Sequence, residues 1–412
     1  MEAESSPQTS KKAPPSGAGR AGLYIHVPFC KQACHYCDFH FSTSLKHRNQ
    51  MLSAMAKEIE LRKDELGDIT IETIYFGGGT PSILTIEELN FLIKTVYQNF
   101  KVSEGPEITL EANPDDLISS CSNENIVRLS AVEAASLNTF QAYKSIGINR
   151  LSIGVQSFFE EDLKLMNRAH NANEAEECIK EATKYFDNIS IDLIYGIPSM
   201  DNKRWQRNIE IALDFGIPHI SSYALTVEPK TALKTFIDKG VIADVDDEQA
   251  EAQFQILIET LEAADFIHYE LSNFGKEGFF SRNNKSYWQG KPYLGIGPSA
   301  HSFSGEIRSW NIRNNVKYIK AIQAGTFPKE QETLSLTDRY NEYVMTGLRT
   351  IWGVSLEKVQ IDFGLQYKKY LLEQAEPLIN EHLLYIDENK LLVARKSKFL
   401  SDGIASKLFK LN

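Results

Sequence analysis

Three cysteines lie close together near the start of the chain, at positions 30, 34 and 37. They belong to the segment Tyr24-Ile-His-Val-Pro-Phe-Cys30-Lys-Gln-Ala-Cys34-His-Tyr-Cys37-Asp-Phe39. Thiolates are soft ligands that select zinc or iron–sulfur centres, and a loop with this spacing can wrap such a centre. The segment therefore predicts a metal site.

The identity of the metal depends on whether a fourth protein ligand exists. A closed structural zinc site needs four ligands. The two remaining cysteines are poor candidates, because Cys121 falls in a polar stretch and Cys178 in a predicted helix, where a lone cysteine is usually a small apolar residue. Histidines 26, 35 and 40 could complete a zinc site, so zinc stays an alternative. Three thiolates on a [4Fe–4S] cluster instead leave one iron open, which an amino acid moiety can chelate while the cluster reduces a bound sulfonium.

The spacing Cys30-x3-Cys34-x2-Cys37, placed after a predicted strand, resembles the signature of the radical-SAM superfamily. The resemblance extends over nearly the whole chain from Leu23 and is closest to the coproporphyrinogen-oxidase-like branch, in particular to its heme chaperones, the HemW group. It implies an α/β fold, a partial (β/α)6 TIM-like barrel, with a [4Fe–4S] cluster on the three cysteines and bound S-adenosylmethionine.

The same resemblance implies which residues bind adenosylmethionine. A glycine-rich turn, Phe76-Gly77-Gly78-Gly79-Thr80-Pro81, ends the second predicted strand, where glycines let backbone amides approach a ligand. The full implied set is Tyr24, Tyr36, Gly78, Gly79, Thr80, Glu111, Gln156, Arg168, Asp192 and Ala224. Physical reasoning supports Asp192, because a carboxylate inside the apolar run Ile191-Asp-Leu-Ile-Tyr is costly to bury without a partner. Its alternative role is structural, paired to Arg150 or Arg168.

The elements that position these residues can be read from the hydrophobic pattern. Short β-type runs alternate with segments of helical period, which is typical of βα units around a parallel sheet. The six runs are 23–27, 73–76, 107–110, 150–155, 188–194 and 219–225. Thr85 and Glu88 predict a capping box for the second helix. All of the implied contacts are then expected at or just past the carboxyl ends of the strands, on the face where barrels build their sites.

Other segments lie outside this repeat. Residues 1–20 are rich in small and polar residues and are expected to be a disordered tail. The polar stretch 117–135 is expected to be a surface insertion. A barrel with its extension is expected over 21–327, followed by a small C-terminal α+β, winged-helix-like domain over 328–412, with a strand near 391–393.

Composition limits the function. The net charge of −11 disfavours a broad nucleic-acid surface. No stretch approaches the roughly 20 apolar residues that span a bilayer, the N-terminus lacks the apolar core of a signal peptide, and five cysteines without a disulfide pattern fit a reducing compartment, so we expect a cytoplasmic protein without a transmembrane segment.

Two functions from different classes fit the resemblance. One is an oxygen-independent coproporphyrinogen III oxidase, and the other is a heme chaperone that passes heme to an acceptor protein. Oxidases of the family follow the third cysteine with Gly-Cys, whereas Asp38-Phe39 follows Cys37 here, as in the chaperones. Three further segments resemble the chaperones: 270–274, 287–290 and 294–301. A radical-SAM enzyme with another substrate is a third possibility.

One departure concerns the heme ligand. Relatives read His-Asn-x-x-Tyr-Trp where this chain has Asn283-Asn284-Lys-Ser-Tyr287-Trp288. An amide is a poor ligand for heme iron, so this position is in doubt as a heme ligand. The heme ligand therefore stays unassigned, with His170, His268, His301 or a cysteine as candidates.

Overall fold

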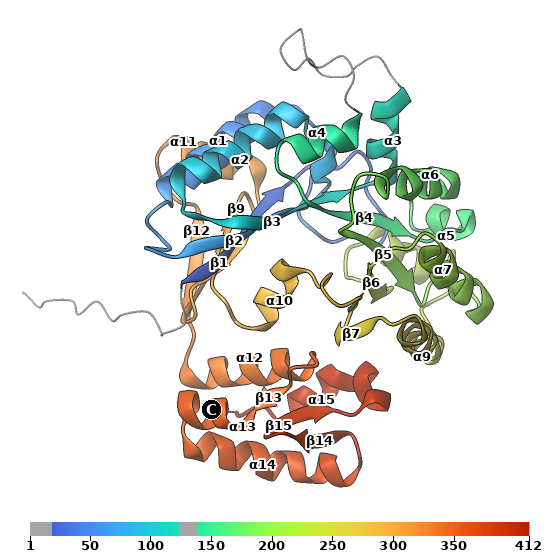
Figure 1. The fold of residues 1–412 in the computed structure, drawn as a ribbon, viewed down its shortest axis with the longest axis vertical. Coiled ribbons are helices and arrows are strands. Elements are labelled where there is room, and N and C mark those ends of the chain that lie inside the picture. Colours follow the sequence, from blue (N-terminus) through green and yellow to red (C-terminus); the bar gives the residue numbers. More distant parts are fainter. Residues whose placement is uncertain (1–18, 123–137, 412) are drawn as a thin grey trace, which may run out of the picture.

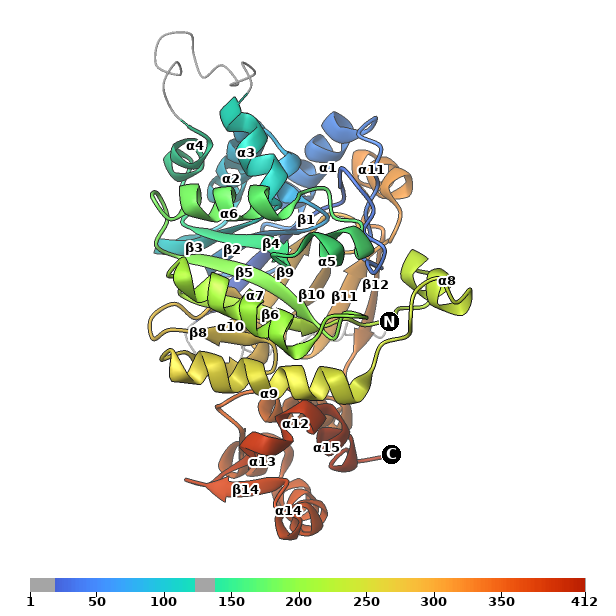
Figure 2. The same cartoon turned by 90° about the vertical axis from the view of Figure 1, so that its right-hand side faces the viewer.

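The computed structural model describes residues 19–122 and 138–411. Within them, twelve strands form one curved sheet in the order β12-β11-β10-β9-β1-β2-β3-β4-β5-β6-β8-β7. The strands β1 to β6 run parallel and each pairs with the next in sequence. This is a partial (β/α)6 barrel, as the sequence predicts, with helices covering its outer face (Figures 1 and 2).

The six parallel strands match the six predicted runs. Their bounds are β1 Arg20–Val27, β2 Thr70–Gly78, β3 Val102–Ala112, β4 Arg150–Gln156, β5 Ile189–Tyr195 and β6 His219–Ala224. The helices on the outer face are α1 Arg48–Leu61, α2 Ile86–Asn99, α3 Pro114–Ser122, α4 Thr139–Ser145, α5 Glu160–Leu165, α6 Ala172–Ala182, α7 Asn202–Asp214 and α9 Asp247–Ala263. Helix α8 Ala232–Asp238 lies to one side of the sheet, next to the loop that follows β1 (Figure 2). The capping box of Thr85 and Glu88 at the start of α2 is present as predicted.

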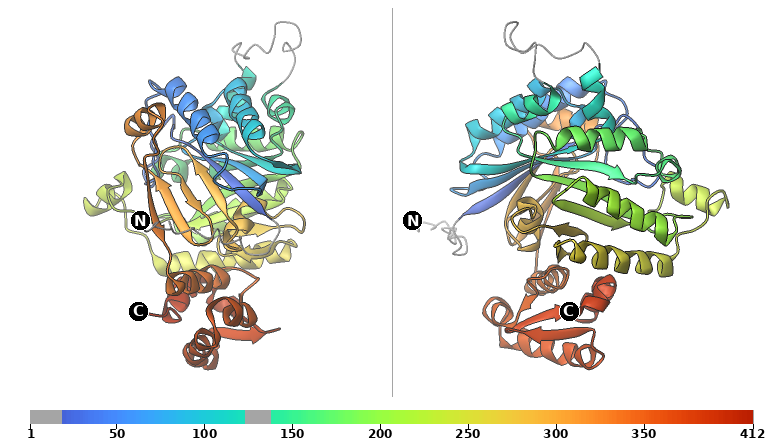
Figure 3. Two further views of the ribbon diagram at one scale, coloured as in Figure 1. Left: turned by 90° about the vertical axis from the view of Figure 1, so that its left-hand side faces the viewer. Right: turned by 45° about the vertical axis from the view of Figure 1, so that its right-hand side comes forward.

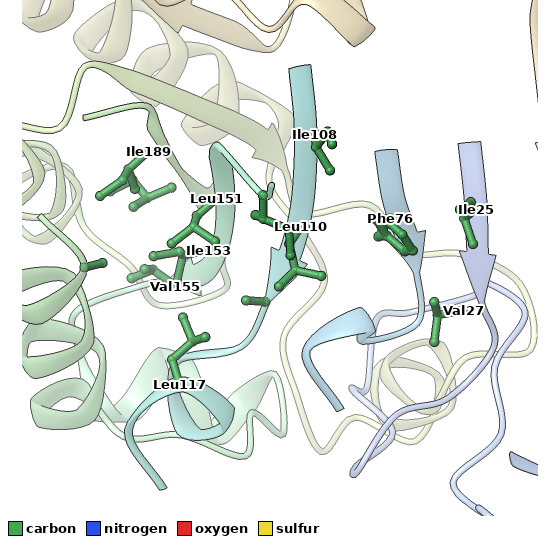
Figure 4. Packing of buried hydrophobic residues seen from close by; sticks show 14 of the residues in the cluster. Ile25, Val27, Phe76, Ile108, Leu110, Leu117, Leu151, Ile153, Val155 and Ile189 are labelled. Carbon is green, nitrogen blue, oxygen red and sulfur yellow. The ribbon is translucent and has the colours of Figure 1, made fainter. Parts of the chain in front are cut away.

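The two faces of the strands differ in chemistry. Alternate residues point toward the helices and are apolar and fully buried, including Ile25, Phe76, Leu110 and Ile153 (Figure 4). Because side chains alternate along a strand, the residues between them face the inside of the barrel. That inner face is polar on β3 to β6: Thr109 and Glu111, Arg150 and Ser152, Ser190 and Asp192, Ser221 and Tyr223. The core thus lies between sheet and helices, and the barrel interior is left for ligands.

The sheet continues beyond the barrel on both sides. Strands β7 Ile267–Glu270 and β8 Asn273–Gly275 extend it next to β6, while β9 Tyr293–Ile296, β10 His301–Phe303, β11 Ile307–Asn311 and β12 Lys329–Thr333 extend it next to β1 (Figure 3). Helix α11 Asn315–Gln323 packs against α1. The short helix α10 Arg282–Trp288 contacts β1 and β2 from inside the curve of the sheet (Figure 1).

The C-terminal domain is small and separate in its core. It contains α12 Leu336–Leu348, β13 Val354–Ser355, α13 Leu356–Phe363, α14 Leu365–Asn380, β14 Leu384–Asp387, β15 Lys390–Val393 and α15 Ser401–Lys407. Three of these elements form a separate antiparallel sheet in the order β13-β15-β14, and the buried residues of this domain form a second hydrophobic cluster.

Three expected boundaries differ from the structure. Arg20, placed in the tail, begins β1 and pairs with Glu72; residues 1–18 lie outside the described part. The insertion expected from residue 117 begins inside helix α3, where Leu117 is fully buried because α3 packs on α6; residues 123–135 lie outside the described part. The boundary expected at residue 327 precedes β12, but β12 pairs with β11, so the large sheet extends to Thr333.

Candidate functional site

The three cysteines lie on a loop that leaves the end of β1. Two local hydrogen bonds close the loop: Cys30 N donates to Ser42 O at 3.1 Å, and Ser42 N donates to Pro28 O at 3.0 Å. It is fastened to distant segments by His35, whose N–H donates to Met166 O at 3.0 Å and whose carbonyl accepts from Leu233 N at 2.9 Å. These bonds hold the loop over the carboxyl ends of the strands.

The thiols are partly buried, and burial keeps those of Cys30 and Cys37 protonated when no metal centre is bound. Burial, followed by the neighbouring thiols, raises the pKa of Cys30 to about 11, and burial also raises the pKa of Cys37 to about 11. All three side chains are partly exposed. Since a metal ligand must be the thiolate, binding of a metal centre has to displace these protons, and the gain from coordination must exceed that cost.

The three histidines of this region are engaged elsewhere. His26 donates from Nε2 to the His40 carbonyl at 2.9 Å, and its Nδ1 accepts from the Tyr24 hydroxyl at 3.3 Å. His35 Nδ1 lies 2.9 Å from Leu165 O, and His40 Nε2 lies 2.7 Å from the side-chain oxygen of Asn315. Burial lowers the pKa of His26 to about 4, which keeps it neutral. Over the described ranges no three His, Cys, Asp or Glu side chains converge on a single metal ion.

The glycine-rich turn lies directly under this loop. Gly79 N donates to Val27 O at 2.9 Å and Thr80 N donates to Phe29 O at 2.6 Å. A Cβ on Gly79 would come within 2.5 Å of the Phe29 carbonyl, and Gly78 has a φ of +107°. Only glycine fits both positions, so the turn and the cysteine loop pack as one backbone unit.

Glu111 lies at the end of β3 beside this turn. Its carboxylate accepts hydrogen bonds from the Tyr75 hydroxyl at 2.8 Å and from Gly78 N at 3.2 Å. Burial, aided by the negative charge of Asp192, raises the pKa of Glu111 to about 7 despite these bonds. A Cβ on Gly77 would lie 3.0 Å from Glu111 Oε1, so the missing side chain leaves room next to the carboxylate. A cationic group of a ligand is the partner that this carboxylate lacks.

Arg168 joins the cysteine loop to the barrel. Its guanidinium donates to Cys34 Sγ at 3.2 Å, to the side-chain oxygen of Asn113 at 2.7 Å and to Gly154 O at 2.9 Å. The amide of Asn113 in turn donates to Thr80 Oγ1 at 3.3 Å. A positive charge is therefore held next to one of the thiols.

Asp192 lies on β5 and faces the barrel interior. Burial raises its pKa to about 6, while a hydrogen bond from Ser221 and the charges of Arg168 and Arg150 oppose the rise. In the described part of the chain neither arginine forms an ion pair with Asp192, so the structural pairing considered from the sequence is absent there.

Below this group lies a small polar cavity of about 50 Å³. All its lining residues are polar: Tyr75, Glu111, Arg150, Ser152, Ser190, Asp192, Ser221, Tyr223, Ser281 and Asn284. It begins at Glu111 and Asp192 and continues into the barrel. The site therefore offers carboxylates near its mouth and hydroxyl groups deeper inside.

The other residues implied by the resemblance gather around the same mouth. Tyr24 stacks on Tyr75, with ring centroids 6.0 Å apart. Burial raises the pKa of Tyr36, which also faces the charge of Arg168. Gln156 ends β4 with a φ of +69°, and its amide lies within 2.9 Å of a Cβ built on Gly154. Ala224 ends β6 and is partly buried.

Several residues of this site were not predicted from the sequence, among them Tyr75, Asn113 and the cavity residues Ser152, Ser190, Ser221, Tyr223 and Ser281. Tyr75 donates to Glu111, and Asn113 connects Arg168 with Thr80. The sequence did indicate Asn113, because it is a polar residue between the end of β3 and Pro114, and side chains at such strand ends face the site. Tyr75 had a weaker signal, since aromatic residues are common in any strand.

Comparisons with known proteins identify the family and the fold of this chain. Residues 24–212 match the model of the radical SAM superfamily, and residues 334–400 match the HemN C-terminal domain. The chain is 30% identical to the heme chaperone HemW of Bacillus subtilis over 92% of this chain and 97% of that protein. It is 32% identical to the mitochondrial radical S-adenosyl methionine domain-containing protein 1 of Bos taurus, over 84% of this chain and 76% of that protein. Its fold is similar to that of Escherichia coli coproporphyrinogen III oxidase (HemN), with a TM-score of 0.79 and 21% identity over 95% and 90% of the two chains.

Proposed function

Since the chain belongs to the HemW family of radical-SAM proteins, we propose that it is a heme chaperone that carries a [4Fe–4S] cluster and adenosylmethionine and delivers heme to an acceptor protein. Membership of the superfamily implies the cluster and adenosylmethionine. Heme as cargo and a heme acceptor as partner rest on the names of the relatives and on the features described below.

We assign the cluster to Cys30, Cys34 and Cys37. The donor set fits, because it supplies three thiols on one loop, and the nearby histidines use ring nitrogens in other hydrogen bonds. A [4Fe–4S] cluster held this way has one iron without a protein ligand, to which the amino acid end of adenosylmethionine binds. Arg168 would place a positive charge beside the cluster through Cys34.

We assign adenosylmethionine to the mouth of the barrel. Glu111 is the partner for a cationic group, and the glycine-rich turn lets the ligand approach the backbone. Asp192 adds a second carboxylate whose pKa is raised by burial and which has no ion-pair partner in the described residues. The remaining proposed contacts are Tyr24, Tyr36, Gly78, Gly79, Thr80, Gln156, Arg168 and Ala224.

The observation that carries the choice between chaperone and oxidase is the residue pair after Cys37. Asp38-Phe39 stands where oxidases of the family carry Gly-Cys. The Phe39 side chain is 68% exposed, so it fills no core position, and the loop has no fourth thiol there. Loss of that thiol with retention of the cofactor pocket favours carrying a tetrapyrrole over decarboxylating one.

The cellular compartment is a separate proposal. Among the described residues no helix has the length and apolar character needed to cross a bilayer. The cytoplasm is our proposal from cysteine usage, which fits a reducing compartment.

The test separates the two functions on one preparation. The anaerobically reconstituted protein is incubated separately with heme and with coproporphyrinogen III, each with adenosylmethionine. We expect stoichiometric heme binding, seen by absorption, and no decarboxylation above background. Adenosylmethionine-dependent formation of protoporphyrinogen would replace the chaperone by the oxidase, and absence of heme binding would favour a radical-SAM enzyme with another substrate.

A further inference from the structure

The floor of the barrel cavity holds a buried positive charge. Arg150 begins β4, is 2% exposed and lines the polar cavity. Its Nη1 donates to the Asn188 side-chain oxygen and to Phe279 O, the latter at 3.4 Å. These acceptors are both neutral.

The rest of the guanidinium has no partner within residues 19–122 and 138–411. Nε and Nη2 form no hydrogen bond there, and they are not among the sealed buried atoms, so they retain access to the cavity. A buried charge is costly unless it is paired and hydrogen-bonded. Arg150 thus presents N–H donors and a positive charge to the cavity.

Two further donors lie on the same floor. Ser281 Oγ accepts from Asn284 N at 3.2 Å, which leaves its hydroxyl proton free to donate. The side-chain amide of Asn284 forms no hydrogen bond in the described part of the chain, and both residues line the cavity with Arg150. Glu107 holds this floor in place by accepting from the backbone N–H groups of Arg282 and Asn283 at 3.1 and 3.0 Å.

We propose that Arg150, Ser281 and Asn284 form an anion subsite that binds a carboxylate side chain of the tetrapyrrole. Planar guanidinium groups recognise carboxylates through two parallel N–H bonds, and Arg150 has Nε and Nη2 free in that arrangement. The cavity also carries Glu111 and Asp192, so a singly charged carboxylate is repelled less than a dianion such as phosphate.

The subsite adjoins the proposed adenosylmethionine site but lies deeper in the barrel. Arg150 pairs with Thr109, two residues before Glu111 on β3, and lines the same cavity as Glu111 and Asp192. A ligand that reaches Arg150 therefore enters the barrel below the mouth. The identity of the carboxylate's carrier rests on the proposed heme function, whereas the anion subsite itself does not.

The experiment compares heme with its dimethyl ester, which lacks free carboxylates, in the same mild detergent. Wild type should bind the free acid about tenfold to a hundredfold more tightly than the ester, the range expected for a charge-assisted bond. Arg150→Met should remove this preference by weakening only the free acid, and Arg150→Lys should keep part of it. Arg282→Met is the matched control, because Arg282 is exposed, is not among the residues lining the cavity, and among the described residues its guanidinium bonds to Gly105 O alone.

A second arm does not depend on heme. Propionate should raise the melting temperature of wild type and of Arg282→Met but not of Arg150→Met, and neutral propionamide should affect none of them. If heme fails to bind but propionate still stabilises, the anion subsite stands and the heme function is wrong. Equal affinity of wild type for acid and ester, or an unchanged preference in Arg150→Met, overturns the subsite; if Arg150→Met does not fold, the wild-type comparison decides alone.

Discussion

Glu111→Gln should stabilise the ligand-free protein while weakening its binding of adenosylmethionine. The carboxylate accepts from Tyr75 and Gly78, yet burial and Asp192 raise its pKa from 4.5 to about 7. A folded-state pKa above the unfolded value means that the folded protein binds the extra proton, so stability falls as pH rises from about 4.5 to about 7. At about 1.4 kcal/mol per pKa unit the loss is about 3 kcal/mol.

The variant removes this loss because its amide cannot ionise. Above pH 7 Glu111→Gln should therefore unfold with a free energy up to about 3 kcal/mol higher than wild type, and near pH 4.5 the two should coincide. Urea midpoints measured without ligand from pH 4.5 to 8 test this. Glu104→Gln, which changes an exposed carboxylate on the same strand, should leave the pH profile unchanged.

Binding should change in the opposite direction. Calorimetry on the reconstituted protein should show adenosylmethionine binding that strengthens from pH 6 to 8 in wild type, as Glu111 ionises. In Glu111→Gln the affinity should fall to about one tenth of the wild-type value or below, and it should not vary with pH over this range. A variant that is less stable than wild type at pH 8, or a difference that does not vary with pH, would refute the reasoning, because the carboxylate would then already be satisfied.

Three further predictions concern the cysteines, Arg168 and Asn283. Replacing any of the three loop cysteines by Ala should abolish the [4Fe–4S] absorption and iron content, whereas Cys178→Ala, in the core of α6, should retain the cluster and lose about 1 kcal/mol of stability. Arg168→Gln removes the charged donor to Cys34, so voltammetry should show a more negative cluster potential; an unchanged potential would count against this contact. Asn283→His should cost about 1–3 kcal/mol by overpacking next to Thr73, and heme absorption shows whether the imidazole also binds iron; an unchanged melting temperature would contradict the tight packing.

The parallel strands were predictable because each carries a short apolar run. The starts of three strands were not: β1 begins at Arg20, β2 at Thr70 and β3 at Val102. Each of these first residues is exposed or half-exposed and becomes extended only by pairing with a neighbouring strand. Strand β12, Lys329–Thr333, is mostly exposed and polar and depends on β11 for its conformation. Local sequence carries little information about edge strands of this kind.

The candidate site was predictable where residue identity restricts chemistry. The cysteine spacing and the glycine-rich turn belong to this class, since thiols bind metals and only glycine tolerates the backbone of Gly78 and Gly79. The partners of Glu111 and the solvent access of Arg150 depend on contacts across strands, which no local pattern records. Their roles had to be read from the structure.

The polar interior of the barrel lowers the free energy of unfolding of the ligand-free protein, so folding gives no reason for these residues. The helix-facing side chains of the same strands are apolar and supply the core. Inside the barrel Glu111 and Asp192 have raised pKa values, and Arg150 has donors that no described residue accepts. Each is destabilising in the ligand-free protein, because buried charges need partners. A ligand pair that brings a cation to the mouth and a carboxylate to the floor would satisfy all three. The two ligands together should therefore stabilise the protein by more than the sum of their separate effects, since the charge of each ligand improves the electrostatic potential at the site of the other.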